Sequence, residues 1–202
     1  MNDSGDDRRV RKTKKALRQG LMALLGKKSL KDISVRELTD AADLHRGTFY
    51  IHYKDIYDLY DKICAESLGE VGSIFDQHPP EELMSSPCGL IRDIMEYAAE
   101  NRDLCRTMLG PRGDQNLVRE LCRILEEKCL HDWSILFPEQ GFGRRDYLCG
   151  YVVTGCMGVV RHWAEGGMAE SPQEMAALLE QITHQGLGLL GEPVRPDPAK
   201  NT

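Results

Sequence analysis

The chain has 202 residues, of which 41% are hydrophobic and 29% are charged, and its formal net charge at pH 7 is -6. These values are ordinary for a soluble globular protein with a sizeable core in one or two domains. No apolar run approaches the roughly 18 residues of a membrane span and the charged start has no secretory signal, so we expect a cytoplasmic protein without a membrane partner.

The first predicted elements are a tail and a long helix. Residues 1–7 are predicted to be a disordered tail, and a helical pattern begins at about Arg9. Gly26 is a plausible stop for this helix because glycine favours the position after a helix end. The apolar stripe that supports the helix has spacings of seven, four and three residues. It consists of Val10, Leu17, Leu21 and Leu24.

Two short helices are predicted next. Ser34 followed three residues later by Glu37 is a capping box, so a helix should begin at Val35. Asp43 and Leu44 then form a turn, and a second short helix runs over about residues 45–51. Two short helices joined by a tight turn after a longer helix are typical of a helix-turn-helix domain.

The rest of the chain is also predicted to be helical. Asp55 can cap a helix that ends near Phe75, before a proline-containing stretch over 77–89. Ser171 and Pro172 provide an N-cap and a first helical residue for the last helix. The expected helices after residue 77 cover about 90–100, 102–109, 116–137, 144–165 and 172–190. With no period-two pattern found, the sequence predicts an all-α fold.

Seven cysteines are present, and none has the C-x-x-C or C-x-x-H spacing of a zinc site. We therefore predict no metal ligands, and nothing in the sequence calls for a cofactor. The interpretation that fits a cytosolic chain best is a set of reduced thiols that act as small core hydrophobes. A redox-sensing thiol is the alternative, because reactivity depends on exposure and positive surroundings.

Positive charge is concentrated near the N-terminus. Residues 8 to 62 hold 14 Lys and Arg against 7 Asp and Glu, whereas residues 63 to 202 hold 12 against 22. A basic first part attached to an acidic remainder indicates that only the first part meets a polyanion. Whether the basic residues 8–12 enter a minor groove or remain in solvent is open, and we favour solvent.

The stretch HRGTFYIHYKD, residues 45–55, combines phosphate-binding donors with aromatic rings. Phe49 and Tyr53 are four residues apart and share a helix face, so they can pack inward with apolar residues of the preceding helix. The residues that then point outward form a small, donor-rich face that suits a DNA major groove. They are Gly47, Thr48, Tyr50 and Ile51. The alternative is an ordinary exposed helix end, because such ends also carry Tyr, His and Lys.

The run from Lys12 through Leu59 resembles the DNA-binding domain of TetR-family (AcrR-like) transcriptional regulators. The residues that carry the resemblance are Ala16, Leu17 and ISVRELTDAADLHRGTFYIHYKDIYDL, centred on the T-F-Y-x-H-Y run from Thr48 to Tyr53. The resemblance implies an N-terminal three-helix helix-turn-helix domain joined to a C-terminal helical bundle that dimerises. It also implies a homodimer on a double-stranded DNA operator, with half-sites about one helical turn apart.

The resemblance also implies roles for individual side chains. Arg36 matches a position that often reaches DNA, and Tyr50 and His52 match a pair that clamps phosphates. One departure is Ile56, which stands where family members often carry a phosphate-binding Lys; Lys54 is the candidate substitute. The predicted DNA-binding set is Arg36, His45, Arg46, Gly47, Thr48, Tyr50, His52 and Lys54.

Residues 100–114 and 151–179 resemble a C-terminal domain type common in Firmicutes regulators of this family. The domains expected from both resemblances are a DNA-binding domain over 8–54 and a ligand-binding and dimerisation domain over 55–191, with a second disordered tail over 192–202. The helix over 144–165 is apolar nearly all round, and Gly150, Gly155 and Gly158 would suit close contact with another helix. The last two helices are therefore the predicted dimer surface, a purely intramolecular core being the alternative.

Family members of this architecture usually bind a small-molecule effector among the C-terminal helices. Each candidate contact for an unknown effector is an aromatic, sulfur-containing or imidazole side chain that could instead be plain core. The candidates are Tyr97, Cys105, Met108, Trp133, Cys156, His162 and Trp163.

The favoured function is a DNA-binding repressor that an unknown small molecule releases from DNA or modulates. The first alternative is a coactivator on the same fold that acts through a protein partner, since the subgroup includes proteins resembling a coactivator of dihydroxyacetone kinase genes. An enzyme is disfavoured because the sequence has no Gly-rich phosphate loop, H-E-x-x-H or G-x-S-x-G motif, so no catalytic residue is predicted.

Overall fold

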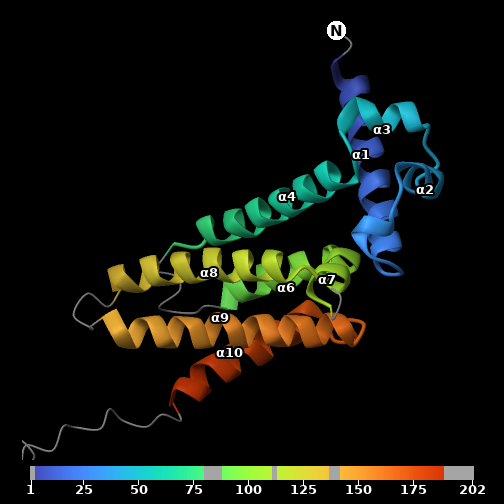
Figure 1. Cartoon of the computed structure of the whole chain (residues 1–202). Coiled ribbons are helices and arrows are strands. Elements are labelled where there is room, and N and C mark those ends of the chain that lie inside the picture. Colours follow the sequence, from blue (N-terminus) through green and yellow to red (C-terminus); the bar gives the residue numbers. More distant parts are fainter. Residues whose placement is uncertain (1–2, 80–87, 111–112, 137–141, 189–202) are drawn as a thin grey trace, which may run out of the picture.

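The computed structural model describes residues 3–79, 88–110, 113–136 and 142–188. Within these ranges the regular elements are helices, which confirms the all-α prediction (Figure 1). None of the helices found there combines the length and the apolar character needed to cross a membrane. We call α1, α2 and α3 the head and the later helices the body.

The head begins earlier than expected. Its first helix, α1, spans Asp3–Leu25, so the predicted disordered tail over 1–7 is wrong for residues 3–7. The three Asp in residues 3–7 lower the net positive charge of this otherwise basic helix. The predicted stop is confirmed, since the Gly26 amide donates to the Met22 carbonyl as the helix ends.

The helix-turn-helix prediction is confirmed in its local details. After a single 3-10 turn at Leu30–Asp32, α2 spans Val35–Ala41 and α3 spans Arg46–His52. The Ser34 hydroxyl accepts the Glu37 amide at 3.2 Å, as an N-cap should. The turn between the two helices contains Asp43 with a positive φ of 52°. Asp tolerates this left-handed conformation better than most residues, which allows the chain to reverse here.

The head core joins all three of its helices to the start of the body. Leu17 and Leu21 of α1, Leu38 of α2 and Phe49 of α3 are fully buried in one apolar cluster. The first half of α4, which spans Ile56–Asp76, adds a further row of buried side chains, so the core continues across the predicted domain boundary at residue 54. These residues are Ile56, Leu59, Tyr60 and Ile63.

The body helices match the expected ranges within a few residues. They are α6 Cys88–Glu100, α7 Arg102–Leu109, α8 Gln115–Leu136, α9 Phe142–Glu165 and α10 Pro172–Gly188. Two predicted caps are confirmed, because Asp55 accepts the Asp58 amide at 2.9 Å and Ser171 accepts the Glu174 amide at 3.2 Å. The predicted end of the last helix, Leu190, and the tail over 192–202 lie outside the described residues.

One short helix connects the two parts. In α7, Leu104 and Met108 are buried in the head cluster, whereas Cys105 is buried in a body cluster with Met95 and Trp163. Figure 1 shows α4 leading from the head to the body, with α7 at the end of the body that faces the head. Because its side chains are buried in both clusters, α7 joins the head core to a body core.

Candidate nucleic-acid interface and effector cavities

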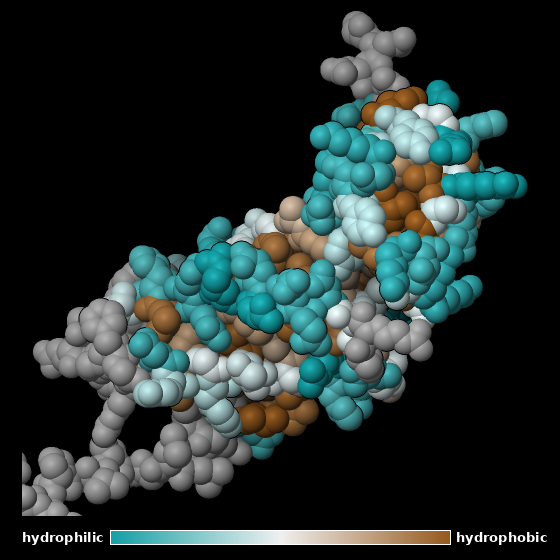
Figure 2. All heavy atoms as spheres, in the orientation of Figure 1, coloured by the Kyte–Doolittle hydropathy of each residue, from teal (hydrophilic) through white to brown (hydrophobic). Residues whose placement is uncertain are grey.

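The recognition helix α3 separates its side chains as predicted. Phe49 and Tyr53 face inward, with 0% and 6% of their surface exposed, and close the head core. Arg46 and Gly47 are exposed on the other side, and Tyr50 is 48% exposed. Figure 2 shows mostly hydrophilic side chains over the visible face of the head, with hydrophobic atoms reaching the surface between them.

Arg46 and Tyr50 form a bonded pair on this outward face. One guanidinium nitrogen of Arg46 donates to the Tyr50 hydroxyl at 3.0 Å, and the guanidinium carbon lies 5.5 Å from the ring centre. The Tyr50 ring in turn packs edge-on against buried Phe49 at 5.4 Å between centroids. The guanidinium has four further N–H groups and the hydroxyl keeps its proton, so both side chains retain donors for DNA.

The other predicted DNA contacts surround this pair. His45 is exposed at the N-cap of α3 and makes no side-chain cap bond, and Thr48 is half-buried. Arg36 is exposed on α2, where its nearest charged partner is Asp40 at 3.9 Å. Such an exposed, long ion pair contributes little to stability, so it leaves Arg36 free to exchange partners.

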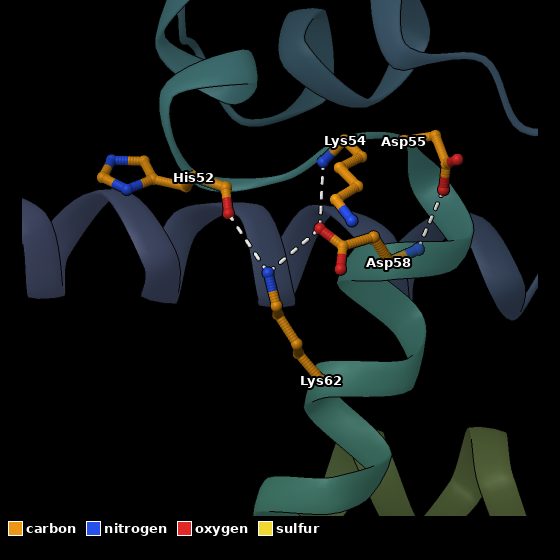
Figure 3. Close-up of polar contacts among 5 residues, drawn as sticks. All are labelled: His52, Lys54, Asp55, Asp58 and Lys62. Atoms are coloured by element: carbon orange, nitrogen blue, oxygen red, sulfur yellow. Dashed lines mark hydrogen bonds and ion pairs between the residues drawn. The ribbon is translucent and has the colours of Figure 1, made fainter.

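A polar network holds the junction between α3 and α4 (Figure 3). The Asp58 carboxylate accepts the Lys54 amide at 2.9 Å and the Lys62 ammonium at 3.0 Å, and Lys62 also donates to the His52 carbonyl at 3.4 Å. The Lys54 amide, followed by Lys62, holds the pKa of Asp58 below its usual value. The His52 ring points away from the network in Figure 3, which leaves its imidazole for another partner.

Ile56 lies where the resemblance leads one to expect a phosphate-binding Lys. Its side chain is only 5% exposed and belongs to the head core, so it makes no outward contact. Lys54, two residues earlier, is exposed; its backbone amide donates to Asp58, and its charge helps to lower the pKa of that carboxylate. The structure therefore leaves Lys54 as the cation of this junction that faces solvent from the α3–α4 loop.

The predicted effector residues do not converge on one cavity. Cys105, Cys156 and Trp163 belong to one body cluster, but Met108 belongs to the head core and Tyr97 to another body cluster. His162 is exposed on α9, and the side chain of Trp133 lies outside the described residues. The assignment of these seven residues to an effector site therefore stays a prediction. Those that are buried, Cys105, Met108 and Trp163, pack in the hydrophobic clusters.

Two of the cavities that the described residues line share Glu66, Glu100 and Asn101. A groove of about 590 Å³ lies between α4 and α6, and Tyr97 is the one predicted effector residue that lines it. Burial raises the pKa of Tyr97 to about 12, and its hydroxyl donates to Glu70 at 2.8 Å. A second cavity of about 470 Å³ lies where α1 meets the body. Neither cavity was predicted from the sequence, because the residues that line each cavity come from different helices.

Two features of the cavities escaped the sequence interpretation. The first is the carboxylate character of the groove, which three glutamates from α4 and α6 supply: Glu66, Glu70 and Glu100. The second is Asn101, which lines both cavities and whose side-chain oxygen accepts a hydrogen bond from Arg18 of α1 at 3.1 Å. The only sequence feature that pointed to Asn101 was its place between the predicted helices over 90–100 and 102–109.

The face that α9 and α10 turn to solvent is unusually apolar. Tyr147 and Tyr151 of α9 are 84% and 62% exposed, and Leu178 and Ile182 of α10 are each 44% exposed. Other apolar residues of these two helices, which are the predicted dimer surface, are buried within this chain instead, namely Val160, Trp163, Met175 and Leu179. The predicted surface is thus divided between the chain's own core and an exposed face.

The cysteines with described side chains are free thiols and lie mainly in the helical interior. Burial raises the pKa of Cys105 to about 11, which disfavours its thiolate. The pKa of Cys129 is also raised, first by its hydrogen bond with the Cys149 thiol and then by burial. These environments agree with the core interpretation more than with a reactive thiol.

Comparisons with known proteins agree with this architecture. Residues 87–185 match the family TetR_C_8, described as a transcriptional regulator C-terminal region. The HTH-type transcriptional regulator YxbF of Bacillus subtilis is 22% identical over 172 residues, which cover 84% of this chain but 44% of YxbF. The chain thus spans less than half the length of this curated relative.

Solved structures with the same fold include a TetR-family transcriptional regulator from Syntrophomonas wolfei. Its TM-score is 0.68 at 15% identity, with 91% of this chain and 98% of that chain covered. FadR from Bacillus subtilis, solved in complex with stearoyl-CoA, gives a TM-score of 0.61 at 13% identity, with 85% and 97% covered. Identities this low show a common fold alone.

Proposed function

We propose that this chain, whose residues 87–185 match a TetR-type transcriptional regulator C-terminal region, is a repressor of the TetR family that binds a palindromic operator as a homodimer. The observation that carries the proposal is the outward face of α3, where Arg46 and Tyr50 offer aligned donors over a rigid aromatic core. An operator-bound repressor needs such a face, because base edges and phosphates are read by preorganised hydrogen-bond donors.

Each predicted DNA contact has a role in this proposal. Arg46 is the base reader, because an arginine fork can bond the O6 and N7 of guanine together. Tyr50, His52 and Lys54 hold phosphates on the groove edge, and Arg36 contacts the backbone from α2. The network at the α3–α4 junction fixes the direction in which His52 and Lys54 leave the head. The remaining members of the set, His45, Gly47 and Thr48, form the part of α3 that enters the groove first.

The homodimer would use the exposed face of α9 and α10. A Cβ added at Gly155 or Gly158 would meet nothing within 4 Å, so no neighbour inside the chain requires glycine there. Two glycines within a helix nevertheless cost about 1 kcal/mol each relative to Ala. Close approach of a second copy, alongside exposed Tyr147 and Tyr151, explains both the glycines and the aromatic surface.

An effector would act at the groove between α4 and α6. Its glutamates disfavour an anionic ligand and favour a neutral or cationic one, in contrast to the acyl-CoA carried by the Bacillus subtilis FadR structure. A ligand in this groove would reach Asn101 and compete for its bond with Arg18 of α1. The effector would bind more tightly to dimers in which the bond between Arg18 and Asn101 is broken than to dimers in which it is intact. This difference in affinity would shift the population of DNA-competent dimers.

A selection experiment tests DNA binding directly. Immobilised full-length protein is incubated with a random-sequence duplex pool, and the recovered duplexes are measured by mobility shift. We expect a palindromic site, and we expect Tyr50→Ala and His52→Ala to weaken binding at every sequence while leaving base preference unchanged. Recovery of no preferred duplex at low salt from an intact dimer would remove the repressor proposal and favour the coactivator alternative.

Sedimentation tests the dimer separately from DNA. Tyr151→Asp places a charge on the exposed face of α9 and is expected to produce monomers. Tyr57→Asp is the matched control, because Tyr57 is similarly exposed at 53% but lies at the start of α4. A wild-type chain that sediments as a monomer, or a dimer unchanged by Tyr151→Asp, would contradict the proposed surface.

A further inference from the structure

One side chain of the recognition helix is exposed without being polar. Ile51 is 76% exposed, more than any other large apolar side chain of the described head. It lies one turn after Gly47 on α3, so the two residues share a helix face. A Cβ added at Gly47 would meet nothing within 4 Å, so the surface over this face is open. The outward side of α3 thus has an apolar row, Gly47 and Ile51, beside the polar row of Arg46 and Tyr50.

The major groove contains one apolar group on a base edge. Thymine carries a 5-methyl group there, whereas cytosine presents an amino donor and the purines present acceptors and donors. An isoleucine side chain can bury a methyl group favourably, but it can bond none of the polar edges it would desolvate. An exposed isoleucine on a groove-facing helix therefore discriminates in favour of thymine and against cytosine.

We propose that Ile51 reads the 5-methyl group of a thymine in each half-site, and that Gly47 lets the α3 backbone come close enough for this contact. The inference rests on the proposed DNA binding through α3 and adds a base preference to it. Arg46 and Ile51 are five residues apart, or about 7.5 Å along the helix axis. Base pairs are spaced by about 3.4 Å, so the thymine should lie about two pairs from the base that Arg46 contacts.

The test removes the methyl group from the DNA and the side chain from the protein. The probe is the duplex recovered by selection on the wild-type protein, with each thymine replaced in turn by deoxyuridine. At one position per half-site, wild-type affinity should fall about fourfold, as expected for one buried methyl group. Ile51→Ala should bind the thymine and uracil duplexes equally well. Ile51→Val, which keeps two methyl groups, should retain part of the difference.

Gly47→Ala gives an independent readout. In the free chain this substitution meets no neighbour, and alanine favours a helix more than glycine does, so the variant should melt at a higher temperature than the wild type. Its affinity for the selected duplex should nevertheless fall, because the added methyl group lies between the helix and the groove floor. A structural role for Gly47 would instead lower the melting temperature.

The outcomes separate this inference from the proposed function. If the wild-type protein selects a duplex but no thymine-to-uracil change weakens binding, the Ile51 assignment is wrong while DNA binding stands. The same conclusion follows if the wild type and Ile51→Ala lose equal affinity at every position. If the wild type selects no duplex, the proposed function fails and this inference fails with it.

Discussion

An arginine of the body and an arginine of the head differ in the charge of the residues that bind them. In the body, Arg123 is held by Glu120 at 2.6 Å and Glu127 at 2.5 Å, so its charge is neutralised within one helix surface. In the head, Arg46 is held by a neutral partner, Tyr50, at 3.0 Å and keeps its full positive charge. Other cations of the head do form ion pairs, as Arg36 does with Asp40, so the contrast concerns these two arginines. The charge of Arg123 is met within its own helix, whereas that of Arg46 remains available to another molecule.

The two parts also differ in where apolar surface is left over. The exposed large apolar residues of the head are few, and Ile51 and Tyr50 lie on the recognition helix itself. In the body, Tyr57 is exposed at the start of α4 beside the head, and the other exposed large apolar residues belong to α9 and α10, the helices farthest from the head in Figure 1. Charge is therefore available at one end of the molecule and apolar surface at the other, which fits a polyanion at the head and a second copy at the body.

The largest expected change in the free energy of unfolding comes from a substitution in the head core that leaves the body helices unaltered. Phe49→Ala removes a side chain with no exposed surface from the head core, and we expect a loss of about 3 to 5 kcal/mol in the free energy of unfolding. Denaturant unfolding followed by circular dichroism measures it. Sedimentation of the same variant should still show dimers at low temperature. Loss of the dimer together with DNA binding would contradict the view that the two surfaces are separate.

A double-mutant cycle on Arg46 and Tyr50 sharpens the contrast in charge. Arg46→Ala should relax the preference for one base pair by about 1 to 3 kcal/mol, because a bidentate base contact is lost. Tyr50→Phe keeps the ring but removes the hydroxyl that accepts from Arg46. We expect the effects of the two substitutions on affinity for the matched duplex to be less than additive when measured by mobility shift, because the Arg46–Tyr50 bond is lost in either variant. Strict additivity would show that the pair does not act as a unit.

A smaller effect is expected from Asp58, which holds the α3–α4 junction. The pKa of its carboxyl is lowered in the folded chain, so its stabilising contribution is present above the unfolded value of about 4 and is lost as pH falls through the folded value. Asp58→Asn should therefore unfold more readily than the wild type at neutral pH, and the difference should shrink below about pH 4. Thermal unfolding midpoints across this range measure it. A constant difference at all pH values would exclude the carboxylate as the cause.

The smallest effect is expected at Arg123 in the body. Its two ion pairs are exposed, so Arg123→Ala should change neither the unfolding midpoint nor DNA affinity measurably. This variant is the control for Arg46→Ala, because both remove one exposed arginine from a helix. Weakened DNA binding in the Arg123 variant would mean that overall charge, not the position on α3, determines affinity.

Much of the fold and part of the site could be predicted from local sequence. The caps at Ser34, Asp55 and Ser171 set the starts of three helices because a side-chain oxygen next to a free amide is a local interaction. The inward placement of Phe49 and Tyr53 followed from their four-residue spacing. The early start of α1 was missed because a polar, glycine-containing start lacks the apolar stripe on which that prediction relied.

Which residues share a helix face could be read from local sequence, since the 3.6-residue period is a property of the backbone. Which face is buried could not, because burial depends on the helix that packs across it. Thus Trp163 is in the body core while Tyr151 of the same helix is exposed, and the predicted effector residues are divided among separate clusters. The bond between Arg46 and Tyr50 likewise depends on buried Phe49, against which the Tyr50 ring packs.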